Sequence, residues 1–443
     1  MRVEDIAQQV AQAVHDRGVD DVEVMLSFSR QALTRFANNA IHQNVAESVL
    51  NLSVRPRIDG RTARASTNRV DADGVREVVD QAIALTRLTE PDEESLPMAK
   101  AEEYGEVYRW SDATARVTPS DRAKAVAEAI AAVESAGQTA AGIYSTDATE
   151  YTLLNSRGVH AHYRETMARF SITAMGAGSS GWAKASACDH GDIDPLELAI
   201  SAARKGSQSA APRELPPGRY TVILEPAAVL DLVGQMFGDF SATAIRDGRS
   251  FLNDRIGKQI FGPNITIHDD AWHPLQSGAP FDGEGVPRQR LTLVENGVVR
   301  DIAYCRQAAA LAGVMPTGHG FPLPNEYGEA PVNIVIAGGD TSVDKMVATT
   351  ERGILVTRLW YIREVDPYEK IFTGMTRDGT FLVEGGEVTA GVRNLRFNQG
   401  LMEMLSNVVD FGPAVRASGE ETFDMVAPAM RIHDFNFTEV TRF

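Results

Sequence analysis

Apolar and polar residues alternate along the first part of the chain in a way that predicts short β-strands. These strands are expected at Val22–Leu26, Ala32–Phe36, Val49–Val54 and Thr62–Ser66. Asn38-Asn39 and Asp59-Gly60 supply turn residues between them. Apolar residues at helical spacing predict one helix near the N-terminus and another from about Asp73. We therefore expect an α+β domain over residues 1–90.

Two segments rich in proline and polar residues, at 89–97 and 207–218, divide the rest of the chain. Between them, helical and strand-like patterns predict a central α/β domain over residues 98–210. Residues 219–443 alternate strand-like runs with Gly-containing turn signals, which predicts a large, mostly antiparallel, β-rich C-terminal domain. The expected fold class is α+β, with N-terminal α/β units followed by this domain.

Residues 221–260 predict a strand, an amphipathic helix and a Gly-flanked turn. One apolar face of the helix is formed by Val229, Val233, Met236, Phe237, Phe240 and Ala244. The predicted helix contains no His, Cys or Glu. It therefore lacks the residue types that bind zinc most often.

Charge and composition exclude several classes of protein. The formal net charge of −17 disfavours nucleic-acid binding, because phosphate contacts need clustered Lys and Arg. No apolar run approaches the roughly 18 residues of a membrane span, and we expect no signal peptide, because the N-terminal segment lacks its basic and apolar regions. Cys188 and Cys305 are far apart, which excludes a disulfide framework or a CxxC metal site. We expect a cytoplasmic protein.

Three motifs suggest chemistry but favour simpler interpretations. Residues 176–181 match GxGxxG, yet no helix of useful length follows to hold a pyrophosphate, so a Gly-rich connection between strands is favoured. Residues 188–190, Cys-Asp-His, bring a thiol near an imidazole only in sequence, and a structural role is favoured. The His268–His273 segment is the densest group of potential metal ligands; it is expected to be a loop with solvated acids.

Four polar residues are candidate substrate contacts. His319 lies in a Gly- and Pro-rich loop of a length that often lines a site. Arg393 and Arg396 could anchor a carboxylate, and Asn407 follows a short predicted helix. The structural alternatives, a solvent-exposed loop histidine and surface ion pairs, stay open.

Ordered motifs along nearly the whole chain resemble the TldD/PmbA (TldE) family of peptidase subunits. In chain order, these motifs are Asp21–Val24, Asp59–Arg61, Ala65–Asn68, Leu154–Gly158, Arg255–Gln259, Phe281–Pro287, Val294–Gly297, Pro316–His319, Val392–Phe397 and Leu405–Val408. Each motif is weak alone, but their order and spacing make the resemblance specific.

The resemblance implies a zinc site in one branch of the family, with HExxxH on the helix after the first strand of the C-terminal domain and a Cys near the C-terminus. Such a metal activates a water for amide hydrolysis. An ungapped alignment places the three zinc-motif positions on Val233, Gly234 and Gly238, and no Cys follows Cys305. By this alignment the zinc site is missing, as in the PmbA/TldE branch, which is known as the partner of the metal-bearing subunit.

The resemblance therefore implies a metal-free, PmbA/TldE-like subunit of a heteromeric zinc metallopeptidase that acts on unfolded or leader-type peptides. It implies a TldD-like partner that carries the zinc, and no catalytic residue or cofactor in this chain. Two alternatives stay open. One is a homo-oligomeric protein that binds or modifies peptides or small molecules without a zinc partner, using the His268–His273 segment and His319. The other is a scaffold that kept the fold for assembly only.

Overall fold

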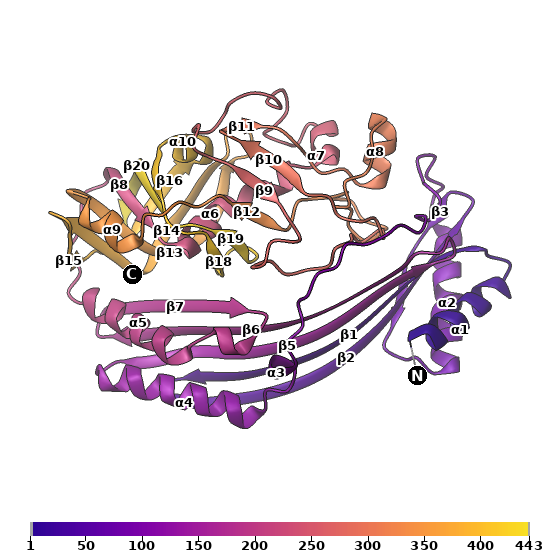
Figure 1. Ribbon diagram of the computed structural model, residues 1–443, viewed down its shortest axis with the longest axis horizontal. Coiled ribbons are helices and arrows are strands. Elements are labelled where there is room, and N and C mark those ends of the chain that lie inside the picture. The colour runs from indigo at the N-terminus through magenta and orange to yellow at the C-terminus, as the bar shows by residue number, and fades with distance from the viewer. Residues whose placement is uncertain (1–2, 442–443) are drawn as a thin grey trace.

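The computed structural model describes residues 3–441, and its N-terminal part is built on one long sheet (Figure 1). The strand order is β3-β2-β1-β5-β6-β7, with β4 also paired to β2, and every pairing is antiparallel. The strands are β1 (Asp21–Ala37), β2 (Ala40–Ile58), β3 (Arg61–Thr62), β4 (Ala65–Thr67), β5 (Thr139–Asn155), β6 (His160–Gly176) and β7 (Ser179–Ala187).

This sheet is longer and more continuous than the sequence pattern predicts. β1 pairs with β5 from Glu23 to Phe36, so residues from the expected first and second domains share one sheet. The expected strands Val22–Leu26 and Ala32–Phe36 are both part of β1, and Val49–Val54 is part of β2, whereas the expected strand Thr62–Ser66 is divided between β3 and β4. Burial explains the difference, because residues 40–49 of β2 are all exposed and need no apolar alternation.

Two groups of helices cover the long sheet at opposite ends. α1 (Val3–His15) and α2 (Ala72–Leu88) share an apolar cluster with the first part of β1 and the last part of β2. α4 (Pro119–Ser135) and α5 (Pro195–Gln208) pack on the other ends of the strands, around Phe36, Tyr144 and Phe170. The short α3 (Asp112–Ala115) and the 3₁₀ turn η1 (His190–Asp192) precede α4 and α5. Asp194 caps α5 and Pro195 begins it.

The C-terminal domain contains two further sheets, and its mostly antiparallel character is confirmed. The first has the order β11-β10-β9-β12-β19-β18, and the second has the order β13-β8-β20-β16-β14-β15. An additional pairing of β13 with β14 closes five strands of the second sheet into a ring. Only the β12–β19 and β13–β8 pairs are parallel among the named strands of residues 3–441.

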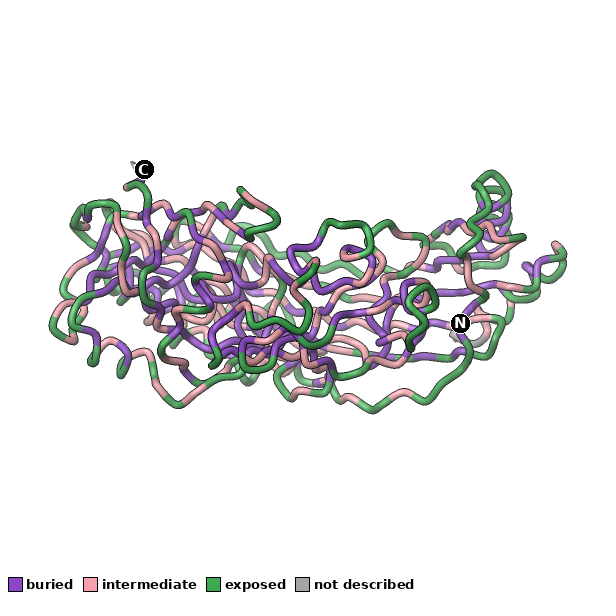
Figure 2. The backbone as a smooth tube through the Cα atoms, turned by 90° about the horizontal axis from the view of Figure 1, so that it is seen from above, coloured by how far each residue is buried: buried purple, intermediate pink, exposed green. Residues whose placement is uncertain are grey.

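The strands of this domain are β8 (Gly218–Leu224), β9 (Ile267–Asp269), β10 (Leu291–Glu295), β11 (Val298–Val299), β12 (Ile334–Ile336), β13 (Arg352–Asp366), β14 (Ile371–Glu384), β15 (Glu387–Gly391), β16 (Leu395–Gly400), β17 (Val408–Phe411), β18 (Val415–Ala417), β19 (Met425–Ala427) and β20 (Met430–Val440). Its helices are α6 (Pro226–Val233), the 3₁₀ segment η2 (Gly234–Asp239), α7 (Ala242–Arg246), α8 (Arg306–Ala312), α9 (Val343–Ala348) and α10 (Leu401–Ser406). The main apolar core lies in this domain, and Figure 2 shows buried residues gathered there.

Strand β7 connects the long sheet to the C-terminal domain through contacts on both of its faces. Its small residues face α5: a Cβ added at Gly181 would lie 2.2 Å from the Ala202 carbonyl oxygen. Its alternate residues face the C-terminal domain: Ser180, Trp182, Lys184 and Ser186. Because strand side chains alternate between faces, one strand packs on a helix and presents a polar row to the opposite domain. No helix within residues 3–441 is both long enough and apolar enough to cross a membrane.

Candidate functional site

The segment that carries the three zinc-motif positions is buried at its start and exposed near its end: Val233 is fully buried, Gly234 is half-buried and Gly238 is exposed. α6 has no exposed face: its residues from Ala228 to Val233 are all buried. The predicted helix ends at Val233, and the chain continues as η2 and then α7. The six residues of its predicted apolar face all lie in the core, so the burial prediction is confirmed although the single helix is not.

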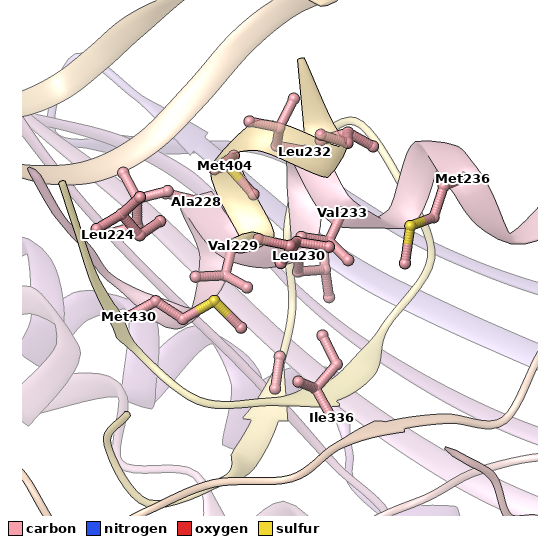
Figure 3. Packing of buried hydrophobic residues seen from close by; sticks show 14 of the residues in the cluster. Leu224, Ala228, Val229, Leu230, Leu232, Val233, Met236, Ile336, Met404 and Met430 are labelled. Atoms are coloured by element: carbon pink, nitrogen blue, oxygen red, sulfur yellow. The ribbon is translucent and has the colours of Figure 1, made fainter. Parts of the chain in front are cut away.

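The residues at the zinc-motif positions do not fit a metal site. Val233 is fully buried in the main apolar core, and Figure 3 shows it packed among apolar side chains. A Cβ added at Gly234 would lie 2.6 Å from the Thr422 hydroxyl oxygen, so a larger side chain there would have to displace Thr422. Gly238 has free space around it but no donor atom. Within residues 3–441, no three His, Cys, Asp or Glu side chains lie close enough together to hold a metal ion.

A charged cleft of about 420 Å³, lined in part by Thr422, lies between β6 and β7 and the segment 416–424. Arg169 and Lys184 line it from the long sheet, and Arg416 and Asp424 line it from the C-terminal domain. Because Thr422 also blocks the space beside Gly234, this cleft lies next to one of the three zinc-motif positions. We take this Thr422 cleft as the candidate functional site.

Asp424 is the centre of the polar network in the Thr422 cleft. Its carboxylate accepts hydrogen bonds from Ser186 Oγ (2.9 Å), Ser418 Oγ (2.7 Å) and the Arg416 guanidinium (3.0 Å). Burial opposes ionisation, but the attraction to Arg416 and the hydrogen bonds outweigh it, so the pKa of Asp424 lies below its ordinary value. A carboxylate held ionised by three donors is a structural anchor rather than a general base.

Lys184 and Asp231 hold the rim of the Thr422 cleft. Lys184 Nζ lies 3.2 Å from Glu420 Oε1 and donates to the Gly419 carbonyl oxygen at 2.5 Å. Asp231, on α6, accepts the backbone N–H groups of Glu420 and Glu421 at 2.9 and 3.0 Å. Burial raises the pKa of Asp231 to about 6. Sequence analysis did not select Asp231, although a lone acid in the apolar run VLDLV is a signal that could have found it.

The four sequence-predicted substrate contacts lie in separate places. His319 is buried rather than solvent-exposed; its Nε2 lies 3.1 Å from Asp269 Oδ1 and its Nδ1 lies 3.0 Å from the Thr317 hydroxyl. Arg396 lies on β16 beside Glu439, and Asn407 ends α10. Arg393 lines a different cavity, between the β6–β7 hairpin and the C-terminal domain. None of the four lines the Thr422 cleft.

The remaining motifs have structural explanations. Gly176 pairs with Ser179 across a hairpin turn, which confirms the Gly-rich connection between strands. Cys188 Sγ lies 3.6 Å from the Thr166 hydroxyl, while Asp189 caps the η1 turn. The His268–His273 segment begins in β9 rather than wholly in a loop, because residues 267–269 pair with β10 and β12. Asp269 of this segment is the partner of His319.

Comparison with known proteins shows to which protein family this chain belongs. Models of the PmbA/TldA metallopeptidase family match residues 22–86 (domain 1), 113–209 (central domain) and 217–439 (C-terminal domain). A metalloprotease of Methanothermobacter thermautotrophicus is 25% identical over 281 residues, which cover 59% of this chain and 60% of that protein. The metalloprotease PmbA of Escherichia coli O157:H7 is 26% identical over 243 residues, which cover 54% of this chain and 51% of that protein.

The match to each of these two relatives spans little more than half of its length. Among solved structures, TldE from Thermococcus kodakarensis superposes with a TM-score of 0.89 at 20% sequence identity. That comparison covers 98% of this chain and 100% of the other, and at this identity it shows the fold.

Proposed function

Because this chain belongs to the PmbA/TldD family of metallopeptidases, we propose that it is a metal-free, PmbA/TldE-like subunit of a heteromeric zinc peptidase. Its partner is a TldD-like chain that carries the zinc, and its substrates are unfolded or leader-type peptides in the cytoplasm. One observation carries the proposal: the zinc-motif positions hold Val233, Gly234 and Gly238, packed so that metal-binding side chains do not fit at the first two.

The packing around α6 supports the proposed lack of a metal site in this chain. A histidine in place of Val233 would bring an imidazole into a fully apolar core, where an unpaired polar group is costly. A glutamate in place of Gly234 would collide with Thr422 and Met425. The neighbouring Asp424 is already saturated by Ser186, Ser418 and Arg416.

Strand β2 supports a role in holding an extended peptide. Along residues 40–51 it pairs with β1 on one side, and its other edge has no partner strand within residues 3–441. An open strand edge binds extended peptides through backbone hydrogen bonds with little sequence preference. With a net charge of −17, the chain suits basic or neutral peptides better than acidic ones over most of its surface.

The test is co-expression of this chain with an HExxxH-bearing family member from the same genome, followed by affinity capture and zinc analysis of each chain. We expect stable capture, about one zinc per partner chain, negligible zinc in this chain, and cleavage of an unfolded peptide only by the pair. The matched control replaces the glutamate of the partner's HExxxH by glutamine, which should preserve capture and abolish cleavage.

Stoichiometric zinc bound by the isolated chain would refute the proposal. Cleavage or modification of peptides by a homo-oligomer of this chain, with no partner captured, would instead favour the homo-oligomeric alternative.

A further inference from the structure

A second cavity, of about 790 Å³, lies at the junction of the long sheet and the C-terminal domain, and we call it the hairpin cavity. The Gly-rich turn of the β6–β7 hairpin, residues 176–180, lines one side, and residues 377–380 of β14 and 392–394 line the other. Its volume is within the range of about 300–1,000 Å³ that is usual for sites that enclose a ligand. It shares no lining residue with the Thr422 cleft.

The charged residues of the hairpin cavity favour an anion. Those that line it are Arg358, Arg377, Asp378 and Arg393. Arg358 and Asp378 are a buried ion pair, which leaves Arg377 and Arg393 as the excess charge. This local positive excess occurs in a chain whose net charge is −17, so general surface composition does not explain it.

The two excess arginines are available to a ligand. The Arg393 side chain makes no hydrogen bond or ion pair with any residue between 3 and 441, and Arg393 lines the cavity. Arg377 makes one loose ion pair, 3.4 Å from Nε to Asp378 Oδ2, and stacks over the Trp360 ring at 4.9 Å. Stacking on an indole orients a guanidinium while leaving its N–H edge free to donate.

The wall behind these arginines is rigid. Asp378 accepts a hydrogen bond from Ser180 Oγ at 2.6 Å and two more from the buried Arg358. The Arg358 guanidinium also lies over the Trp182 ring. Its backbone φ is +51°, an uncommon conformation for a residue within a strand. At Gly379, φ is +131° and a Cβ would lie 2.4 Å from Thr357 Oγ1, so only glycine fits. Backbone held in such conformations by its neighbours is common at ligand sites.

We propose that the hairpin cavity binds a carboxylate group of an extended peptide, held by Arg377 and Arg393. A guanidinium matches the two oxygens of a carboxylate with two parallel N–H donors. Hydroxyl and amide groups of Thr380 and Asn394 add polar contacts at the same wall. The peptide nature of the ligand rests on the proposed function, whereas the carboxylate chemistry rests on the cavity itself.

The experiment measures binding of three N-acetylated penta-alanine peptides to the purified chain: the free acid, the C-terminal amide, and the amide with a central glutamate. Binding is followed by calorimetry and by tryptophan fluorescence, because Trp360 lies beneath Arg377. The test variant is Arg393→Gln. The matched control is Arg87→Gln, because Arg87 is an exposed arginine on α2 that also lacks a side-chain partner within residues 3–441.

We expect the free acid or the glutamate peptide to bind at least about tenfold more tightly than the plain amide, since hydrogen bonds between charged groups are the strong ones. Preference for the free acid identifies a C-terminal carboxylate, and preference for the glutamate peptide identifies an acidic side chain. Arg393→Gln should weaken that binding about tenfold, with an unchanged urea midpoint, and Arg87→Gln should not.

Equal affinity for all three peptides, no binding at millimolar peptide, or equal affinity of the two variants would overturn the carboxylate site. Zinc and the partner chain play no part in this assay. Failure of the peptide-binding assay therefore does not count against the heteromeric peptidase proposal. Failure of partner capture, in turn, does not prevent interpretation of the peptide-binding result.

Discussion

Replacing Gly234 or Gly238 by alanine adds one methyl group, and the comparison tests how tightly the zinc-motif segment is packed at each position. At Gly234 the backbone is in the right-handed helical region (φ −58°, ψ −20°), so alanine is allowed by the main chain. The new Cβ would nevertheless lie 2.6 Å from Thr422 Oγ1 and 2.9 Å from Met425 Cε. At Gly238 a Cβ would meet no atom within 4 Å.

These distances give opposite expectations for the two variants. Gly238→Ala should stabilise the chain by up to about 1 kcal/mol, because alanine loses less backbone entropy on folding. Gly234→Ala has the same backbone gain but forces Thr422 and Met425 to move, which costs about 1–3 kcal/mol in a packed region. We therefore expect Gly234→Ala to be less stable than Gly238→Ala by about 1–3 kcal/mol.

Equilibrium unfolding in urea, followed by tryptophan fluorescence, measures the difference. Adding Thr422→Ala to Gly234→Ala should recover part of the loss, and the double-mutant cycle gives the coupling between the two positions. Equal stability of Gly234→Ala and Gly238→Ala would refute the reasoning, since it would mean that the space beside Gly234 can open for a larger side chain.

Three further substitutions test the buried polar groups. Burial raises the pKa of Asp231 to about 6, so the folded chain binds more protons than the unfolded chain between about pH 4 and 6. The free energy of unfolding should therefore fall by roughly 3 kcal/mol as pH rises through that window. Asp231→Asn should remove this dependence of stability on pH, which is measured as the urea midpoint at each pH. Asp424→Asn should cost about 3 kcal/mol at pH 7 by leaving Arg416 buried without a carboxylate. The deficit should shrink as pH falls below about 4, because the unfolded parent chain then binds a proton at Asp424 more readily than the folded chain, whose Asp424 pKa is lowered. His319→Ala should cost about 3 kcal/mol in the same unfolding assay by leaving Asp269 without its imidazole, while peptide affinity stays unchanged.

The local pattern of apolar and polar residues predicted burial and turns well. The six apolar residues of the segment that includes α6 are all buried, and the Gly-rich run at 176–181 contains a hairpin turn. These features depend on near neighbours in the chain. The same pattern missed most of β2, because residues 40–49 are exposed and an exposed strand leaves no apolar alternation to find.

The sequence by itself determined the α+β class, the mostly antiparallel C-terminal domain, the absence of an HExxxH motif and the apolar identity of α6. The tertiary structure alone decided which charges meet. Lys184 reaches Glu420 across more than two hundred residues, His319 finds Asp269, and Arg393 rather than Arg396 lines a cavity. The physical reason is that the spacing of buried residues depends on near neighbours in the chain. An ion pair or a cavity wall depends instead on which distant strands the packing of the whole chain brings together.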